Sequence, residues 1–190
     1  MTTLNDLLAR SGVSLTDVER HLDALPPHAR VLESTNLDRA RQAVLWDLAR
    51  VNAPVTMADL VPDSVPDLTP VPFEGQNAQP LFRTFRKVFY RLPGGRIAGR
   101  NESSISSVVG HGYYSVLPGG PDGVYIDYTQ LPNEAPRSWP GIRRNDRGLS
   151  LPVYGFMKDH LRRVYGRIFI GHATKPIVGS QGHFLLARGD

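Results

Sequence analysis

The stretch from Gly94 to Tyr128 constrains the fold of this chain more than any other part of the sequence. It contains four runs with the composition of β-strands, at residues 96–100, 105–109, 113–117 and 123–129. Between the last two runs, the sequence PGGPDG combines residues that adopt positive φ angles with residues of fixed φ, which is typical of a tight turn. The sequence therefore predicts an antiparallel hairpin here, with a sheet built around it.

Residues 3–50 contain the sequence signals that start and end helices. Thr3 with Asp6, and Ser14 with Asp17, have the spacing of capping boxes, in which a hydroxyl and a carboxylate satisfy free backbone N–H groups at a helix start. A third helix is expected from Thr35, because apolar residues recur at helical spacing until about residue 51. Two or three helices therefore precede the sheet.

Charge divides the chain into two parts. Residues 1–69 contain six Arg and no Lys against ten Asp and Glu, a net charge of −4, and residues 70–190 carry +8. Residues 53–80 are rich in proline, which favours an extended connector without regular structure. We expect a single domain of 190 residues, made of an acidic helical head (1–52), this connector (53–80) and a basic α+β body (81–190).

Two segments of the body are harder to assign. Residues 81–92 suit both a helix and a strand; helical spacing of the apolar residues favours a helix, whose outward side would carry Arg83, Arg86, Lys87 and Arg91. Residues 153–165 are expected to be helical, and strands are expected at 167–173 and 183–188. Since no strand–helix–strand alternation is present, the predicted fold is α+β, with N-terminal helices packed on a mainly antiparallel sheet or partly closed barrel.

Composition excludes several classes of protein. The chain contains no Cys, so disulfides, thiolate metal sites and cysteine nucleophiles are excluded. No segment approaches the length of apolar sequence that a membrane span needs, and the first residues lack the pattern of a signal peptide. We expect a soluble cytoplasmic protein without a membrane span.

Residues 7–22 resemble the helix-turn-helix of bacterial repressors in the spacing of Gly12, Val18 and Leu22. The resemblance implies a DNA-reading second helix, but that helix would bring Asp17 and Glu19 towards phosphates. The basic body also lacks a dense run of Lys and Arg. The sequence therefore favours a small-molecule partner over nucleic acid.

No motif of a known catalytic site is present. The phosphate-loop and dinucleotide glycine patterns and the esterase serine motif are missing, and the six histidines have no metal-ligand spacing. No metal site is therefore predicted, and the sequence does not identify a cofactor. His111 stands between two glycines. Asp127 lies in a strand, where it either faces solvent or, if both surfaces of the sheet are covered, needs a cationic partner such as Arg100 or Arg163. His111 and Asp127 are the candidate catalytic residues, and the candidate ligand-binding residues are Arg100, Asn101, His111, Tyr113 and Asp127.

Three hypotheses for function follow from these residues. The first is a non-catalytic protein that binds a small acidic or amphipathic ligand in an aromatic-lined pocket of the sheet. The second is a hydrolase or lyase that uses His111 and Asp127 as an acid–base pair. The third is a protein-interaction or nucleic-acid-binding module that uses the basic body.

Overall fold

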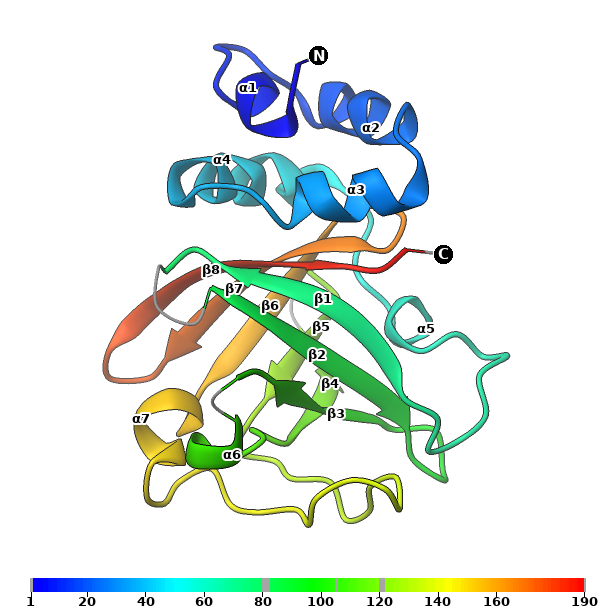
Figure 1. Cartoon of the computed structure of the whole chain (residues 1–190), viewed down its shortest axis with the longest axis vertical. Coiled ribbons are helices and arrows are strands. Elements are labelled where there is room, and N and C mark those ends of the chain that lie inside the picture. Colours follow the sequence, from blue (N-terminus) through cyan, green and yellow to red (C-terminus); the bar gives the residue numbers. More distant parts are fainter. Residues whose placement is uncertain (1, 80–82, 105, 120–121, 190) are drawn as a thin grey trace.

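A computed structural model describes residues 2–79, 83–104, 106–119 and 122–189 of the chain (Figure 1). In this part, eight antiparallel strands form a closed barrel in which each strand pairs with the next and β8 pairs with β1. The strands are β1 (Val71–Asn77), β2 (Thr84–Arg91), β3 (Ile97–Glu102), β4 (Tyr114–Pro118), β5 (Val124–Asp127), β6 (Lys158–Tyr165), β7 (Ile168–Lys175) and β8 (Gly179–Ala187). Closure gives each of these strands a partner on both sides. The α+β class with a barrel-like sheet therefore agrees with the prediction.

Helices precede and interrupt the strands. They are α1 (Leu4–Leu8), α2 (Leu15–Asp23), α3 (Pro27–Ser34), α4 (Arg39–Leu48), a 3-10 turn (Ala49–Val51), α5 (Met57–Leu60), α6 (Ser106–Val109) and α7 (Ser150–Tyr154). Both predicted capping boxes form, at the starts of α1 and α2. The sequence did not predict α3, which starts with proline at its first position, where no N–H is needed. None of the helices in the described residues is long and apolar enough to cross a membrane.

The first four helices lie on one side of the barrel, with α3 and α4 next to the strands and α1 and α2 above them in the view of Figure 1. Leu45 of α4 belongs to the same buried apolar cluster as Ile170 of β7 and Leu185 of β8. The buried side chain of Gln76 in β1 also accepts a hydrogen bond from the backbone N–H of Leu37, at 3.0 Å. The N-terminal helices therefore pack on the outward surface of β7 and β8, and the inward surface of these strands lines the barrel interior.

The inside of the barrel is lined by every second residue of each strand. On β5, Val124 and Ile126 belong to the interior core, together with Tyr128 just beyond the strand, as the predicted alternation requires. One end of the barrel is closed by Val55 and by residues of α5 and its C-terminal side, which belong to the same core. The opposite end, next to α6 and α7, contains a cavity.

Three expected elements are wrong. Residues 84–91 form strand β2 instead of a helix, so Lys87 points into the barrel and not onto an outward basic surface. Residues 158–165 form strand β6, and only Ser150–Tyr154 is helical in that region. The strand expected at 105–109 is the short helix α6. The hairpin of β4 and β5 is confirmed; residues 81, 82, 105, 120 and 121, on which parts of these predictions fall, lie outside the described residues.

The proline-rich connector is more ordered than expected. It contains α5 and the whole of β1, which is paired on both sides, with β2 and β8. Pro72 in β1 is exposed, and its neighbours Val71 and Phe73 are buried inside the barrel. The alternation of buried and exposed positions in β1 therefore extends through a proline that the sequence pattern reads as a strand breaker.

Candidate functional site

A cavity of about 280 Å³ occupies the end of the barrel beside α7. Part of its wall is aromatic or apolar and includes Phe85, Tyr154, Met157, Ala173 and Phe184. The rest is polar and includes Lys87, Asn101, Tyr128 and Asp159. The cavity therefore combines a large apolar surface with a small group of polar side chains, as ligand sites in proteins commonly do.

The polar group is centred on the ammonium of Lys87. Its Nζ forms an ion pair with Oδ2 of Asp159 at 2.9 Å and donates a hydrogen bond to Oδ1 of Asn101 at 3.1 Å. It also donates to the hydroxyl of Tyr128. Only 3% of the Lys87 side chain and 1% of the Asp159 side chain are exposed. All three protons of the ammonium therefore have acceptors inside the barrel.

The surroundings of Lys87 set its charge. Burial lowers the pKa of Lys87 below its ordinary value, and the carboxylate of Asp159 offsets only part of this shift. The Nζ also lies 5.0–5.7 Å from the centres of four aromatic rings, which attract a cation electrostatically; the rings belong to Phe85, Tyr114, Tyr128 and Phe184. Because three acceptors and four rings surround Nζ, the geometry is that of a charged ammonium paired with a carboxylate.

Tyr128 and Asn101 complete the network. Burial raises the pKa of Tyr128 well above its ordinary value, so its hydroxyl stays protonated. The hydroxyl donates to Oδ2 of Asp159 at 3.3 Å and accepts a hydrogen bond from Nδ2 of Asn101 at 2.8 Å. These contacts leave Oδ1 of Asp159 buried and without a hydrogen-bond partner among the described residues. Asp159 also belongs to the cavity wall, so the carboxylate that holds this unpartnered oxygen borders the cavity.

The strand register brings these side chains together. Lys87 of β2 lies directly opposite Asn101 of β3, and Asp159 of β6 lies opposite Ile126 of β5, two residues before Tyr128. Because side chains alternate between the two surfaces of a strand, each of these positions points into the barrel. The site thus draws its side chains from four strands or strand ends that are distant in sequence.

Of the predicted site residues, only Asn101 belongs to this network. Arg100, its neighbour on β3, points outwards, lies 4.1 Å from the ring centre of Trp139 and pairs with Glu102 at 2.6 Å. Tyr113 donates its hydroxyl proton to the backbone carbonyl of Pro140 at 2.5 Å. Arg100 and Tyr113 therefore anchor the long loop that follows β5 to the outside of the barrel.

His111 and Asp127 lie in different surroundings. Asp127 accepts hydrogen bonds from the backbone N–H and the hydroxyl of Thr129, at 2.8 and 2.6 Å, and lies 3.5 Å from Nζ of Lys158. Lys158, and not Arg100 or Arg163, is thus its cationic neighbour. No hydrogen bond between His111 and Asp127 is present in the described residues, so their action as an acid–base pair stays a prediction without a contact to support it.

His111 lines a second, wider hollow of about 630 Å³ outside the barrel. Arg143, Arg144 and Arg147 contribute to the same hollow. Burial, and then the positive charge of Arg100, lowers the pKa of His111, and its Nδ1 has no hydrogen-bond partner among the described residues. This hollow is open and basic, in contrast to the cavity inside the barrel.

Sequence reasoning missed Lys87, Tyr128 and Asp159. One signal was available, because the chain contains only three lysines, at positions 87, 158 and 175, among 22 basic residues. Lysine carries a compact charge that fits a small buried site, whereas arginine has a wide planar head. A rare lysine within an aromatic segment was therefore a candidate for a buried role.

The described residues contain no group of three or more His, Asp or Glu side chains that could hold a metal ion. Comparison of the chain with protein-family models, with curated proteins and with solved structures finds no match. The function is therefore argued from the geometry of the barrel cavity and of the surfaces around it.

Proposed function

We propose that this protein binds a small amphipathic molecule in the barrel cavity, with the apolar part against the aromatic wall and a hydrogen-bond donor directed at Asp159. The observation that carries the proposal is the free Oδ1 of Asp159, which is buried and belongs to a residue of the cavity wall. A buried acceptor without a partner costs about 1–3 kcal/mol. A ligand that donates a hydrogen bond to this oxygen removes that cost.

The charges in the cavity select the head group of the ligand. Lys87 directs its protons to acceptors of the protein, so the available atom is a carboxylate oxygen. A hydroxyl, amide or amine donates to such an oxygen, whereas a carboxylate ligand would be repelled by it. Of the acidic and amphipathic ligands suggested by the sequence, the geometry supports the amphipathic one with a donor head group.

The volume limits the size of the ligand. The cavity volume of about 280 Å³ is near the lower end of the range of about 300–1,000 Å³ typical of small-molecule sites. Phe85 and Phe184 lie in the same wall with their ring centres 6.0 Å apart. We therefore expect one aromatic ring or a short alkyl chain with a single polar head.

A set of compounds with one apolar body and different heads tests the proposal. We expect 4-propylphenol and 4-propylbenzylamine to raise the melting temperature, and 4-propylbenzoate to leave it unchanged. At a ligand concentration of 100 Kd the stabilisation is about 2.7 kcal/mol, which corresponds to a rise of roughly 5–10 °C for a chain of this size. Isothermal titration calorimetry measures the affinities directly.

Two matched variants control the location. Ala173 lines the cavity, and its neighbour Thr174 does not. Ala173→Leu adds bulk inside the cavity and should remove binding, whereas Thr174→Leu should retain it. Equal affinity of both variants for 4-propylphenol, or a preference of the wild type for the benzoate, would contradict the proposal.

A further inference from the structure

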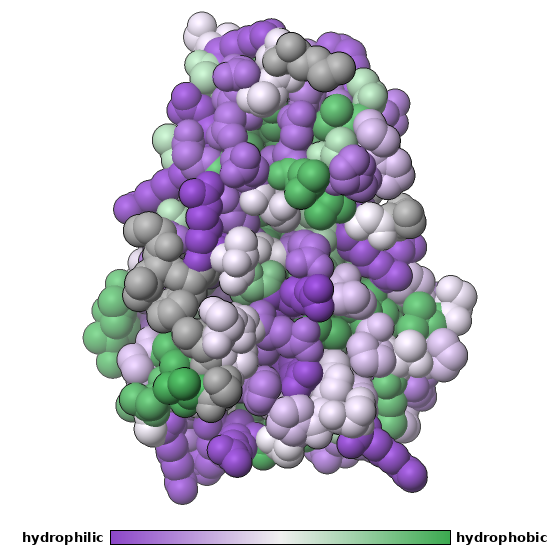
Figure 2. All heavy atoms as spheres, viewed as in Figure 1, coloured by the Kyte–Doolittle hydropathy of each residue, from purple (hydrophilic) through white to green (hydrophobic). Residues whose placement is uncertain are grey.

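Exposed apolar side chains gather around the open end of the barrel. Among the described residues, the head carries two exposed large apolar side chains, Leu32 and Val51. Six others lie in α6, in α7 and its flanks, and in the β7–β8 turn: Val108, Leu149, Leu151, Phe156, Ile177 and Val178. Ile177 is 97% exposed and Val178 69%. Figure 2 shows apolar patches at the lower left, the region where Figure 1 places α7 and the end of the β7–β8 hairpin.

These segments form one continuous rim. Nζ of Lys175, at the end of β7, donates to the carbonyl of Pro152 in α7 at 2.7 Å. The hydroxyl of Ser150 in α7 donates to the carbonyl of Val109 in α6 at 2.5 Å. The rim therefore joins α6, α7 and the β7–β8 turn around the mouth of the barrel cavity, whose wall includes residues 152–154 and 181–184.

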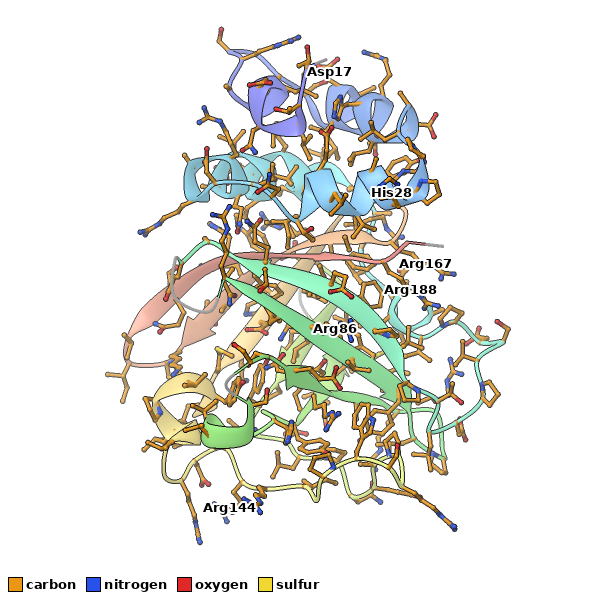
Figure 3. The ribbon with its side chains drawn as sticks, viewed as in Figure 1. Asp17, His28, Arg86, Arg144, Arg167 and Arg188 are labelled. Atoms are coloured by element: carbon orange, nitrogen blue, oxygen red, sulfur yellow. The ribbon has the colours of Figure 1, made fainter. Side chains whose placement is uncertain are left out.

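Positive charge lies directly beside the rim. The outer hollow contains Arg143, Arg144 and Arg147 together with the exposed apolar side chains of Val108 and Leu149. Arg144 projects from the end of the molecule opposite the N-terminal helices (Figure 3), and its charge is offset by Asp146. Arg143 and Arg147 are also exposed. Cationic and apolar side chains thus share one end of the molecule.

We propose that the open end of the barrel docks onto an anionic lipid surface. Ile177 and Val178 enter the boundary between head groups and acyl chains, and Arg143 and Arg147 lie at the level of the lipid phosphates. Peripheral attachment of this kind depends on buried apolar area together with attraction to anionic lipids. The proposal does not depend on what the cavity binds.

The shape of the surface favours a lipid surface over a protein partner. Ile177 and Val178 stand at the tip of a hairpin, where Ile177 is almost fully exposed and Val178 is more than two-thirds exposed. A projecting tip enters a deformable lipid boundary without a preformed groove on the other side. The net positive charge of the 70–190 segment, +8, also complements a negative surface.

Sedimentation with lipid vesicles tests the docking. The full chain is mixed with vesicles of phosphatidylcholine containing 30% phosphatidylserine, and with vesicles of pure phosphatidylcholine. We expect the bound fraction to be at least tenfold larger on the anionic vesicles and to fall when the salt concentration is raised from 0.1 to 0.5 M. Equal binding to both vesicles would overturn the proposal.

Matched variants locate the surface. Ile177→Asp/Val178→Asp should reduce binding to anionic vesicles at least tenfold, whereas Leu32→Asp/Val51→Asp, with equal charge added on the head, should leave it unchanged. Arg143→Ser/Arg147→Ser should reduce it about 25-fold, since each basic residue near an anionic surface contributes about fivefold. The control for these arginines is Arg10→Ser/Arg50→Ser on the head.

Two results would contradict the proposal while leaving ligand binding intact. One is wild-type vesicle binding by the hairpin variant. The other is a dimer of the wild type in size-exclusion chromatography that Ile177→Asp/Val178→Asp converts to a monomer without any vesicle binding, because the rim would then be an interface between two copies of the chain. Calorimetry with 4-propylphenol in the absence of vesicles measures ligand binding in the cavity independently of vesicle binding by the rim.

Discussion

At the scale of single residues, the pair of Lys87 and Asp159 is the feature that stability alone does not explain. A buried ion pair loses the hydration of both charges, and apolar residues of similar volume often replace it without loss of stability. The network here also leaves one carboxylate oxygen without a partner in the described residues. A pair that is costly to bury and incompletely satisfied is better explained by a binding role than by a packing role.

This argument predicts an asymmetry between single and double substitutions. Lys87→Met leaves the carboxylate of Asp159 buried without its cation, and we expect a loss of about 3–5 kcal/mol in the free energy of unfolding. Lys87→Met/Asp159→Leu removes both charges and should restore stability to within about 1 kcal/mol of the wild type, or above it. Urea denaturation followed by circular dichroism measures both values.

The double variant also separates stability from binding. The double variant should fold, because both charges are removed together. It should lose its affinity for 4-propylphenol, because it lacks the acceptor on Asp159. A single Lys87→Met variant as stable as the wild type would show that the two side chains do not depend on each other for charge balance.

At the scale of elements, the buried pair of Lys87 and Asp159 makes the two strands that carry it difficult to recognise from the sequence. The β4–β5 hairpin was predictable, because its turn is strongly marked and Val124 and Ile126 alternate with more polar neighbours. In β2, residues 87–90 are buried on both surfaces of the strand, so apolar residues occur at both inward and outward positions and the pattern resembles that of a helix. In β6, Asp159 occupies an inward position that the alternation assigns to an apolar residue. Both segments wrongly expected to be helical therefore contain one member of the pair.

The barrel also has an internal fit that no local pattern reveals. Three inward glycines each lie opposite an aromatic residue on the neighbouring strand: Gly75 opposite Phe85, Gly99 opposite Tyr114, and Gly171 opposite Phe184. A Cβ at Gly171 would lie 2.1 Å from the ring of Phe184. The absence of side chains at these positions makes room for the rings that form the core and, through Phe85 and Phe184, the cavity wall.

We therefore expect Gly171→Ala to destabilise the protein by about 1–3 kcal/mol, because the core must shift to admit one methyl group. The control is Gly141→Ala in the long loop, where a Cβ would meet no atom within 4 Å; its effect should stay within about 0.5 kcal/mol. Chemical denaturation of both variants gives the comparison. A second variant, Gly171→Ala/Phe184→Leu, should recover part of the loss, and no recovery would argue against a clash with this ring.

At the scale of the whole molecule, the contact between the head and the barrel contains two histidines that favour the neutral state. His172 of β7 lies opposite His183 of β8 with ring centres 4.9 Å apart. Trp46 of α4 covers both rings, at 5.3 and 5.6 Å. Burial, and then repulsion from His172, lowers the pKa of His183 to about 4. Asp47 opposes this shift, and Arg162 and Arg39 add to it.

Neutral histidines at this contact predict a loss of stability in mild acid. The pKa of His183 is about 6.5 when unfolded and about 4 when folded, so between these values the unfolded chain binds more protons. Stability should therefore fall as the pH is lowered from about 6.5 towards 4. Because solvent screens the partly exposed ring, we expect a loss of about 1 kcal/mol, less than the full pKa difference implies.

Urea denaturation at pH 7.5, 6.0 and 5.0 measures this loss. His183→Gln should remove it, so that the free energy of unfolding falls less steeply with pH than in the wild type. The control is His28→Gln, which removes an exposed histidine of α3 that points towards solvent (Figure 3) and should keep the steeper wild-type fall. The same slope in all three proteins would mean that the protonation of His183 does not change the stability of the contact between the head and the barrel.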